Sequence, residues 1–401
     1  MKRVLQITTD FGQGGAERVF NQLSMDLSTN FELYDCVFNQ NRSNVYGKHN
    51  KLLDLNVPSS RAFPAKVYNF LLRVIRLSKL KKKYQIEVSL SHLEGADYVN
   101  ILSKSKDKVI LCIHGSKLYD QEIKGIIGWI RLKFLLPLLY NRADHIVTVA
   151  KEIKTELTGI LKINESKISV INNSFDIQGI QSKSSEPLIS EEYEFLSSHE
   201  VLITSGRLEK QKNHKFLVEL FAEILVKRKS IKLLILGEGS LKNELIMQAD
   251  SLGLKIGFEI LDRNADIYFL GYQSNPFKYI KLAKLFMLTS LWEGFPLALC
   301  EALIIGTPVL AFDCPTGPRE ILTRDSNSII ENDKPQLQSA GVLFPIHDDV
   351  KTSIEQWLNI TNELLNNRVK LKQMSIQAIN VGKSYDKRNI INDWIDLIES
   401  I

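Results

Sequence analysis

Long apolar runs, paired cysteines and a marked excess of charge of one sign are all missing from this sequence. No stretch approaches the roughly 18 apolar residues that a transmembrane helix needs, and the opening residues MKRVLQITTD turn polar too early for a secretory signal. The four cysteines, Cys36, Cys112, Cys300 and Cys314, show no CxxC spacing. We therefore expect a cytoplasmic protein with reduced thiols.

Nucleic-acid binding is the next function that the sequence disfavours. The net charge of +5 is modest for 401 residues, and no basic stripe with interleaved aromatic residues is present. The GxGxxG and GxxxxGKS/T fingerprints of nucleotide binding are absent as well. Any phosphate site in this chain must therefore be of another kind.

Alternating strand and helix patterns run through both halves of the chain. At about 150 residues per domain the length favours two or three domains, and we expect two. The pattern predicts two doubly wound α/β domains with parallel sheets that face each other across a cleft. The expected strands are 4–8, 86–91, 109–113, 145–150 and 167–172 in the first half, and 201–205, 231–236, 267–270, 284–289 and 308–312 in the second. The polar segment 178–198 shows little helical signal and is the expected linker. The domains are then 1–180 and 181–383, followed by a helical tail, 384–401.

The stretch SLWEGFPLALCEALIIG, residues 290–306, places two carboxylates around a turn that enters a helix. Proline suits the first position of a helix, so the helix should begin near Pro296. Glu293 then lies in the preceding loop and Glu301 lies inside the helix. A helix entrance favours anions, so a diphosphate could bind there while Glu301 binds hydroxyls. Spacing alone also fits two solvated or capping carboxylates.

Three further strand-to-helix turns carry chemistry that suits a phosphate ligand. Gly12-Gln13-Gly14-Gly15 follows the first strand, where glycines allow close approach of a ligand or simply form a tight turn. Arg207 and Lys212 follow strand 201–205 and could neutralise a diphosphate, although charged surface loops are common. His114 follows strand 109–113, at the end where open α/β sheets bind ligands, although a lone histidine more often caps or packs.

The spacing of Glu293 and Glu301 resembles the E-x7-E signature of the retaining GT-B glycosyltransferases of family 4. The segments GGAER at 14–18, SVINNSFD at 169–176 and CPTGPRE at 314–320 resemble patterns of the same family. Gly206-Arg207 followed by Lys212 also resembles a pattern of this family. The resemblance covers nearly the whole chain and implies a first domain that binds the acceptor, a second domain that binds a nucleotide sugar, and a terminal helix that packs back on the first domain.

The resemblance also implies the roles of individual residues. The catalytic residues would be Glu293, Arg207, Lys212 and His114. The donor-binding residues would be Gly14, Gly15, Gly237, Gly271, Tyr272, Phe295, Pro296, Leu297 and Glu301.

The implied reaction is transfer of a hexose or N-acetylhexosamine from a UDP-sugar to a hydroxyl, with retained anomeric configuration. The chain contains no D-x-D pair, so we expect no metal ion and no cofactor. Two other classes stay open: another GT-B enzyme, such as a nucleotide-sugar epimerase or a glycosyl phosphorylase, and a non-catalytic subunit that binds nucleotide sugars.

Two basic amphipathic segments, 66–84 and 124–142, could lie on an anionic membrane surface. Each could equally be a surface helix packed on the core, and Pro137 should kink the second. Since many family members use lipid-linked acceptors, the resemblance favours a glycan or lipid-linked glycan acceptor in the synthesis of bacterial surface polysaccharide, lipopolysaccharide, capsule or glycoconjugate. It also favours a peripheral location on the inner face of the cytoplasmic membrane.

Overall fold

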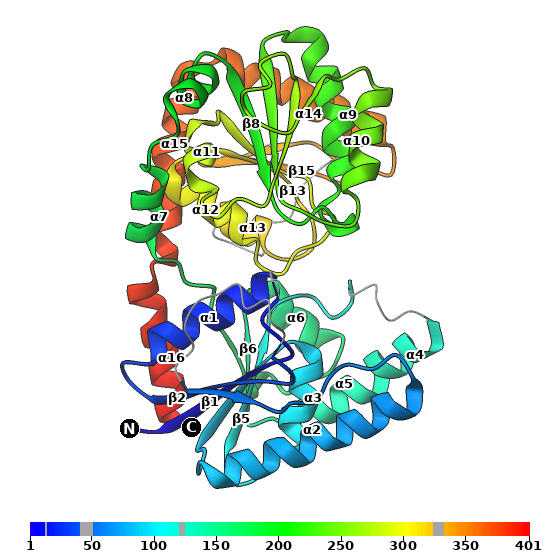
Figure 1. The fold of residues 1–401 in the computed structure, drawn as a ribbon, viewed down its shortest axis with the longest axis vertical. Coiled ribbons are helices and arrows are strands. Elements are labelled where there is room, and N and C mark those ends of the chain that lie inside the picture. The colour runs from blue at the N-terminus through cyan, green and yellow to red at the C-terminus, as the bar shows by residue number, and fades with distance from the viewer. Residues whose placement is uncertain (13, 41–50, 120–124, 324–332) are drawn as a thin grey trace. The chain divides into compact units, whose positions relative to one another are not determined.

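The computed structural model describes residues 1–12, 14–40, 51–119, 125–323 and 333–401 (Figure 1). These residues divide into two compact units. Unit 1 comprises Met1–Ser174 and Lys387–Ile401, and unit 2 comprises Phe175–Asp386. Each unit has its own sheet and its own hydrophobic core.

Unit 1 contains a seven-stranded sheet with the order β3-β2-β1-β4-β5-β6-β7, in which every strand pair is parallel. Successive strands are added outward from β1 to β3 on one side and from β4 to β7 on the other. The strand order therefore reverses between β1 and β4. The strands are β1 (Arg3–Thr8), β2 (Glu32–Val37), β3 (Lys51–Asp54), β4 (Val88–His92), β5 (Lys108–Ile113), β6 (His145–Thr148) and β7 (Ile168–Val170).

Helices cover both faces of this sheet (Figure 1). The first helix, α1 (Gly15–Leu27), contacts the last one, α16 (Lys387–Ser400), and Lys2 Nζ donates a hydrogen bond of 2.9 Å to the carbonyl of Ile398. A second group consists of α2 (Phe63–Lys83), α3 (Glu94–Leu102) and α5 (Leu136–Tyr140), in which α3 contacts both neighbours. The end of the chain is thus part of unit 1.

Unit 2 contains an eight-stranded sheet with the order β10-β11-β9-β8-β12-β13-β15-β14. The described pairs are parallel except for β14, which runs antiparallel to β15 at the edge. The predicted fold class of two parallel α/β sheets is confirmed, with β14 as an addition that the sequence did not indicate. The strands are β8 (Glu200–Ser205), β9 (Ile231–Leu236), β10 (Ile256–Gly257), β11 (Ile267–Gly271), β12 (Leu285–Leu288), β13 (Val309–Phe312), β14 (Gln336–Leu337) and β15 (Gly341–Phe344).

The core of unit 2 is centred on Trp357, whose side chain is fully buried on α14 (Val350–Asn366). The indole stacks on Phe344 with ring centroids 4.1 Å apart, and the rings of Phe216 and Phe312 meet it at steep angles. Aromatic pairs of this kind stabilise a core beyond the area that they bury. Since Phe312 and Phe344 end neighbouring strands and Phe216 lies on α9 (His214–Lys227), this cluster holds those strand ends in place.

The prediction that segment 178–198 contains little helix is wrong. Residues 178–198 lie largely in two helices, α7 (Ile177–Ser184) and α8 (Ser190–Ser197). The Asp176 side chain caps α7 by accepting a hydrogen bond from the N–H of Gly179, and Ile177 and Ile180 are buried. Burial against α11 (Phe277–Leu282) and α12 (Leu297–Ile305) stabilises α7 despite its polar composition.

Both basic segments are helical where the structure describes them. The first is α2. In the second, α4 (Gly125–Ile130) is followed by the π-helical turn Arg131–Leu135 and by α5, and Pro137 is the second residue of α5. Proline lacks the N–H that would continue the helical pattern, and a π turn is a common way to accommodate the change. Lys124, the first residue of that segment, lies outside the described residues. Among the described helices none combines the length and apolar character that crossing a bilayer requires.

Candidate active site

The residues expected to bind the donor follow the carboxyl ends of four neighbouring strands of unit 2. Arg207 and Lys212 follow β8, Gly237 follows β9, Gly271 ends β11 and Glu293 follows β12. The sheet runs β11-β9-β8-β12 here, and its strand order reverses between β8 and β12. Open α/β sheets bind ligands outside the carboxyl ends of their strands at such a reversal. The fold therefore brings these residues together where a ligand is expected.

Hydrogen bonds between main-chain atoms connect three of these strand ends. The N–H of Gly206 donates to the carbonyl of Leu236 at 2.9 Å, and the N–H of Gly237 donates to the carbonyl of Gly271 at 2.8 Å. Gly237 has a φ of 137°, and a Cβ at this position would lie 1.9 Å from the carbonyl oxygen of Gly206. Only glycine fits there, because the backbone of Gly206 fills the space that a side chain would need.

An ion pair joins the two sides of the reversal. Lys212 Nζ, from the loop after β8, lies 2.6 Å from Glu293 Oε1, from the loop after β12. Glu293 is buried, with 5% of its surface exposed, whereas the Lys212 side chain is 20% exposed. An ammonium group carries three donors, so this lysine can bind Glu293 and still offer N–H groups to an anion.

The loop that carries Glu293 is held from both sides. The N–H of Glu293 donates to the carbonyl of Pro315 at 3.1 Å, and the Thr316 hydroxyl donates to the carbonyl of Glu293. On the other side, the Gln211 amide donates to the carbonyl of Trp292 at 2.8 Å. Sequence reasoning did not assign Gln211 or Thr316 to the site, although both lie within segments that it singled out. Their hydrogen bonds fix the backbone around the carboxylate.

Helix α12 begins directly after this loop, at Leu297, with Pro296 in the capping position. Leu299 and Cys300 donate the first hydrogen bonds of the helix, both to the carbonyl of Pro296, so the N–H groups at the start of the helix precede that pattern. Such groups, with the helix dipole, favour an anion. Glu301 lies on this helix and is 3% exposed.

A close contact fixes the approach to α12. Gly317 has a φ of 98°, and a Cβ there would lie 2.5 Å from Pro296 Cδ and 3.1 Å from the Gly294 carbonyl oxygen. Phe295 is buried, with its ring 5.3 Å from that of Tyr385. The turn into α12 is therefore set by packing on the loop after β13.

Arg207 and Tyr272 are exposed at the same edge of the sheet. Arg207 makes no ion pair with the part of the chain that the structure describes, and Tyr272 is 53% exposed. A guanidinium group in this state can bind phosphate oxygens without giving up another partner.

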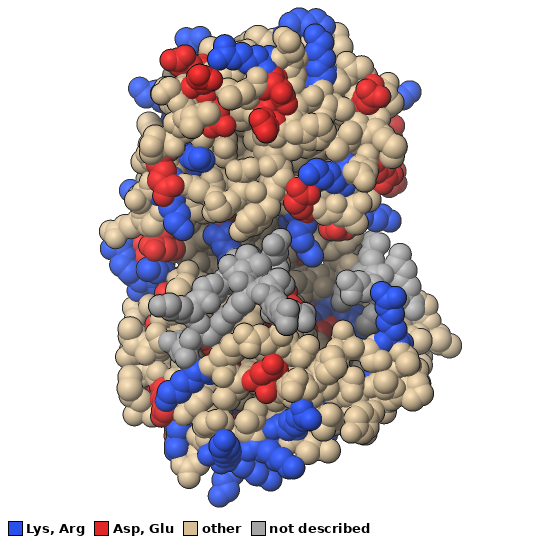
Figure 2. Space-filling view, in the orientation of Figure 1, with Lys and Arg blue, Asp and Glu red and all other residues tan. Residues whose placement is uncertain are grey.

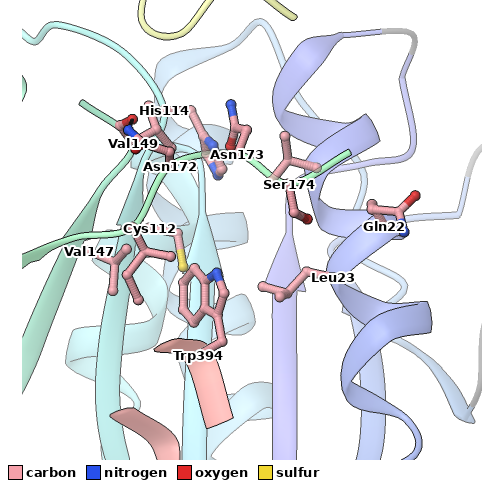
Figure 3. A pocket seen from close by; sticks show the side chains of 12 residues that line it. Gln22, Leu23, Cys112, His114, Val147, Val149, Asn172, Asn173, Ser174 and Trp394 are labelled. Atoms are coloured by element: carbon pink, nitrogen blue, oxygen red, sulfur yellow. Dashed lines mark hydrogen bonds between the residues drawn. The ribbon is translucent and has the colours of Figure 1, made fainter. Parts of the chain in front are cut away.

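The remaining predicted residues lie in unit 1. Gly14 caps α1, Gly15 is its first residue, and both follow β1; Gln13 lies outside the described residues. His114 follows β5. It lines a cavity of about 20 Å³ together with Cys112, Asn173 and Trp394 of α16 (Figure 3). A space of this size holds about one water molecule and no sugar.

A second histidine, which sequence reasoning missed, bonds to His114. His92 ends β4, is fully buried, and its Nδ1 lies 2.8 Å from His114 Nε2. Burial lowers the pKa of His114 to about 3, with Lys117 adding to the effect, and burial also lowers the pKa of His92. Both rings are therefore neutral near pH 7. The sequence signal for His92 was its position directly after the predicted strand 86–91.

The described part of the chain contains no evident set of metal ligands. No group of three or more His, Cys, Asp or Glu side chains is placed there to hold an ion. Metal independence stays a prediction.

Two family models match the chain. The model described as Glycosyltransferase Family 4 matches residues 13–178, and the model described as Glycosyl transferases group 1 matches residues 185–364. The two matches lie mainly in unit 1 and unit 2, respectively.

Two curated relatives match over most of their length. An uncharacterized glycosyltransferase of Methanocaldococcus jannaschii is 29% identical over 353 residues, covering 83% of this chain and 84% of that protein. A Campylobacter jejuni protein is 27% identical over 345 residues, covering 84% of this chain and 88% of its own. Its name is N-acetylgalactosamine-N,N'-diacetylbacillosaminyl-diphospho-undecaprenol 4-alpha-N-acetylgalactosaminyltransferase.

Among solved structures, Anabaena HepE in complex with UDP has a similar fold. The TM-score is 0.74 at 16% sequence identity, and the match covers 100% of both chains. At this identity the likeness concerns the fold alone.

Proposed function

This chain is a GT-B glycosyltransferase of family 4, and we infer that it transfers a hexose or N-acetylhexosamine from a UDP-sugar to a hydroxyl of a lipid-linked glycan with retention of configuration. The observation that carries this proposal is the Lys212–Glu293 ion pair at the entrance to α12, at the strand-order reversal of unit 2. A cation, a carboxylate and a helix start together match the needs of a sugar diphosphate.

The diphosphate is the first part of the donor that these residues suit. When the sugar leaves, negative charge develops on the phosphate oxygen, and groups fixed in advance stabilise that charge best. Lys212, Arg207 and the N–H groups at the start of α12 can supply this stabilisation. Because the two side-chain cations and the helix start can stabilise the charge on the diphosphate, our proposal requires no metal ion.

The second part is the ribose and the sugar. Glu301 would accept hydrogen bonds from the ribose hydroxyls, and Glu293 would contact the sugar or its phosphate. The backbone at Gly237 and Gly271, with Tyr272, would flank the base. Carboxylate and carbonyl oxygens can accept hydrogen bonds from the hydroxyls of the ribose and the sugar and from the N–H groups of the base.

The reaction requires one bond to break and one to form at the anomeric carbon. The bond to the diphosphate oxygen breaks, the acceptor oxygen bonds to the same face of the sugar, and the acceptor proton passes to the departing phosphate oxygen. This course needs no covalent sugar–enzyme intermediate, for which a carboxylate below the anomeric carbon would be required.

Relatives support the identity of both substrates. The Anabaena protein binds UDP, which favours UDP in this chain. The name of the Campylobacter relative specifies an acceptor on diphospho-undecaprenol. We therefore favour a polyprenyl-linked acceptor and a role in bacterial glycoconjugate or surface polysaccharide synthesis.

The surface of unit 1 supports a membrane-bound acceptor. Large apolar side chains on α2 are exposed at steps of four residues, so they lie on one face of the helix. They are Phe63, Val67, Leu71 and Ile75. Basic residues, including Lys79, Lys82 and Lys83, follow at the end of the helix, and Figure 2 shows Lys and Arg side chains gathered where Figure 1 draws that end.

A second apolar surface lies on the α4–α5 segment. Ile126, Ile127, Trp129 and Phe134 are each more than half exposed. Apolar side chains beside basic ones are the pattern of a helix that lies in a membrane interface. We propose an anionic bilayer as the partner of these two surfaces.

Product analysis tests the proposed function. The purified chain is incubated with individual UDP-sugars and polyprenyl-diphosphate-linked acceptors, and the product is analysed by mass and by NMR of the new anomeric centre. We expect one added sugar with the donor's configuration. An isomerised UDP-sugar without transfer would indicate an epimerase, and UDP-sugar binding without any product would indicate a binding subunit.

A further inference from the structure

Exposed apolar side chains recur every four residues along the segment that α4, the π turn and α5 form in unit 1 (Figure 1). They are Ile126, Ile130, Phe134 and Leu138, and they range from 48% to 75% exposed. We call this row the apolar stripe. Other positions of the same segment are buried, namely Gly128, Arg131, Leu136, Leu139 and Tyr140. The segment thus has one apolar exposed side and one buried side.

A regular α-helix would not keep the four side chains of the stripe in line. Each residue turns such a helix by about 100°, so a step of four residues passes a full turn by about 40°. Over the three steps from Ile126 to Leu138 the row would wind by about 120° around the axis. Leu138 would then lie on a different side of the helix from Ile126.

The π turn Arg131–Leu135 removes most of this winding. The N–H of Leu136 donates to the carbonyl of Arg131, five residues back instead of four. The turn therefore holds one residue more than a regular turn, and the extra residue sets α5 back by about 100°. The drift between Ile126 and Leu138 falls to about 20°, so the stripe stays on one side of the whole segment.

Two side-chain contacts with α3 fix the rotation of the segment. Arg131, the first residue of the π turn, is 4% exposed, and its guanidinium donates to both carboxylate oxygens of Glu94, with Nε at 2.5 Å from Oε1. At the end of α5, the Tyr140 hydroxyl donates to Asp97 at 2.9 Å. A bidentate arginine–carboxylate pair is directional, so it holds the turn in one orientation.

The charge of the segment suits an anionic membrane surface. Residues 125–142 contain no Asp or Glu, and Lys133 and Arg142 are exposed. The ring of Trp129 lies 5.5 Å from that of Phe134 in the stripe, and tryptophan is enriched where proteins meet the boundary between lipid and water. A helical segment with one apolar side and basic neighbours is typical of that boundary.

We propose that the π turn keeps the apolar stripe in line so that its four side chains insert together into an anionic bilayer, with Arg131 and Glu94 as positioning residues. The bilayer as partner rests on the proposed function, whereas the alignment of the stripe does not. Arg131 and Glu94 do not insert; they act by fixing the rotation of the segment.

The first test measures which positions enter the bilayer. Ile126→Cys, Ile130→Cys, Phe134→Cys and Leu138→Cys are made singly in the full chain and labelled with a fluorophore whose emission rises in apolar surroundings. The four native cysteines are buried and should not react. We expect emission to rise about twofold or more at all four positions when vesicles that contain phosphatidylglycerol are added. The control is the exposed Lys133→Cys, which should show little rise.

Other patterns of emission would overturn the proposal. A rise that fades from Ile126 to Leu138 would indicate the winding of a regular helix, and no rise at any position would exclude insertion. High emission before vesicles are added would indicate that a second copy of the chain covers the stripe. An equal rise with vesicles of phosphatidylcholine alone would contradict the anionic partner.

The second test removes the contact at the π turn. Arg131→Met takes away the guanidinium, while Glu94 keeps Lys117 Nζ at 3.4 Å and the Tyr98 hydroxyl at 2.5 Å as partners, so its charge is not left alone. The matched control is Arg228→Met, which breaks the pair of Arg228 with Glu200 in unit 2.

We expect Arg131→Met to lower the rise at Ile126 about twofold or more relative to that at Leu138, because α5 keeps its contact with Asp97 while α4 loses the fixed turn that follows it. Arg228→Met should leave this ratio unchanged. Arg131→Lys, which keeps the charge but lacks the planar fork, carries the same test if Arg131→Met does not fold. An unchanged ratio in the folded variant would contradict the positioning role.

The outcome separates this inference from the proposed function. A chain that inserts in the expected pattern but transfers no sugar from any UDP-sugar would refute the proposed function alone. A chain that transfers sugar but lacks this pattern of insertion would overturn the inference alone.

Discussion

Lys212 Nζ lies 2.6 Å from Glu293 Oε1, although the two residues are 81 positions apart in the chain. The contact links the loops that follow β8 and β12, the two strands that flank the reversal in unit 2. Lys212 also anchors this region through its backbone, because the Thr289 hydroxyl donates to its carbonyl at 3.0 Å. The charge and the carboxylate are therefore in place before a ligand binds.

Replacing Glu293 should separate catalysis from nucleotide binding. Glu293→Gln keeps the shape of the side chain but removes the charge that engages Lys212. We expect UDP to bind at least as tightly, because Lys212 is freed for phosphate, while kcat falls about a hundredfold. Initial rates and UDP titrations of the variant measure the two effects. The control is Glu244→Gln, which breaks the exposed ion pair of Glu244 with Lys215 and should alter neither quantity.

Gly237 should tolerate no side chain. In Gly237→Ala the new Cβ would lie 1.9 Å from the Gly206 carbonyl oxygen, so the backbone after β8 or β9 must move. We expect the free energy of unfolding to fall by more than about 2 kcal/mol and UDP affinity to fall with it. Urea denaturation and calorimetry measure these quantities. Gly159→Ala is the control, because a Cβ there would contact nothing within 4 Å. A stable Gly237→Ala variant with normal affinity would disprove the role of this close approach.

Asp97 makes the stability of unit 1 depend on pH. Its carboxylate is fully buried and accepts hydrogen bonds from Ser91 at 2.8 Å and Tyr140 at 2.9 Å. Burial raises the pKa of Asp97 to about 7, against about 3.9 in an unfolded chain. The folded state therefore holds a proton that the unfolded state loses, so the associated stability is complete below about pH 4 and is lost as the pH rises through 7.

Asp97→Asn should remove the loss of stability that the unaltered chain shows as the pH rises. We expect the urea midpoint of the variant to rise relative to the unaltered chain between about pH 4 and pH 7. The exposed Asp250→Asn serves as the control and should show no such trend. A constant difference between Asp97→Asn and the unaltered chain across this range would contradict the proton uptake.

The apolar face of α2 should bind anionic membranes. Leu71 and Ile75 are 54% and 52% exposed on that face. The double variant Leu71→Glu, Ile75→Glu should sediment less with vesicles that contain phosphatidylglycerol, because two charges would enter the interface. Val226→Glu is the control, since Val226 is a comparably exposed apolar residue of α9 in unit 2. Equal sedimentation of both variants would refute the surface on α2.

Local sequence signals predicted much of the fold and the loops of the candidate site. The segment IKLLIL was predicted as a strand and forms β9. The prediction succeeded because strands that are covered on both faces of a parallel sheet consist of nearly continuous apolar residues. The glycine and proline at 294 and 296 correctly marked the turn into α12, because glycine allows unusual backbone conformations and proline fixes its own φ.

Features that depend on distant partners escaped prediction. Strand β2 contains a buried Asp35, which is tolerated because the Ser24 hydroxyl donates to it at 2.6 Å, so its sequence does not read as a buried strand. The short strand β15 is stabilised by pairing with β13. The partner of His92 lies 22 positions away, directly after another strand, and no local pattern reveals such a hydrogen bond.

The central claim is that the cations of unit 2 and the start of α12 bind the diphosphate of UDP without a metal ion. Calorimetric titration of UDP into the chain, in the presence of excess EDTA, tests it most directly. We predict binding in EDTA that magnesium does not strengthen, and a loss of about tenfold or more in affinity for Lys212→Ala but not for Lys215→Ala. Binding that requires a divalent cation, or that Lys212→Ala leaves unchanged, would contradict the claim.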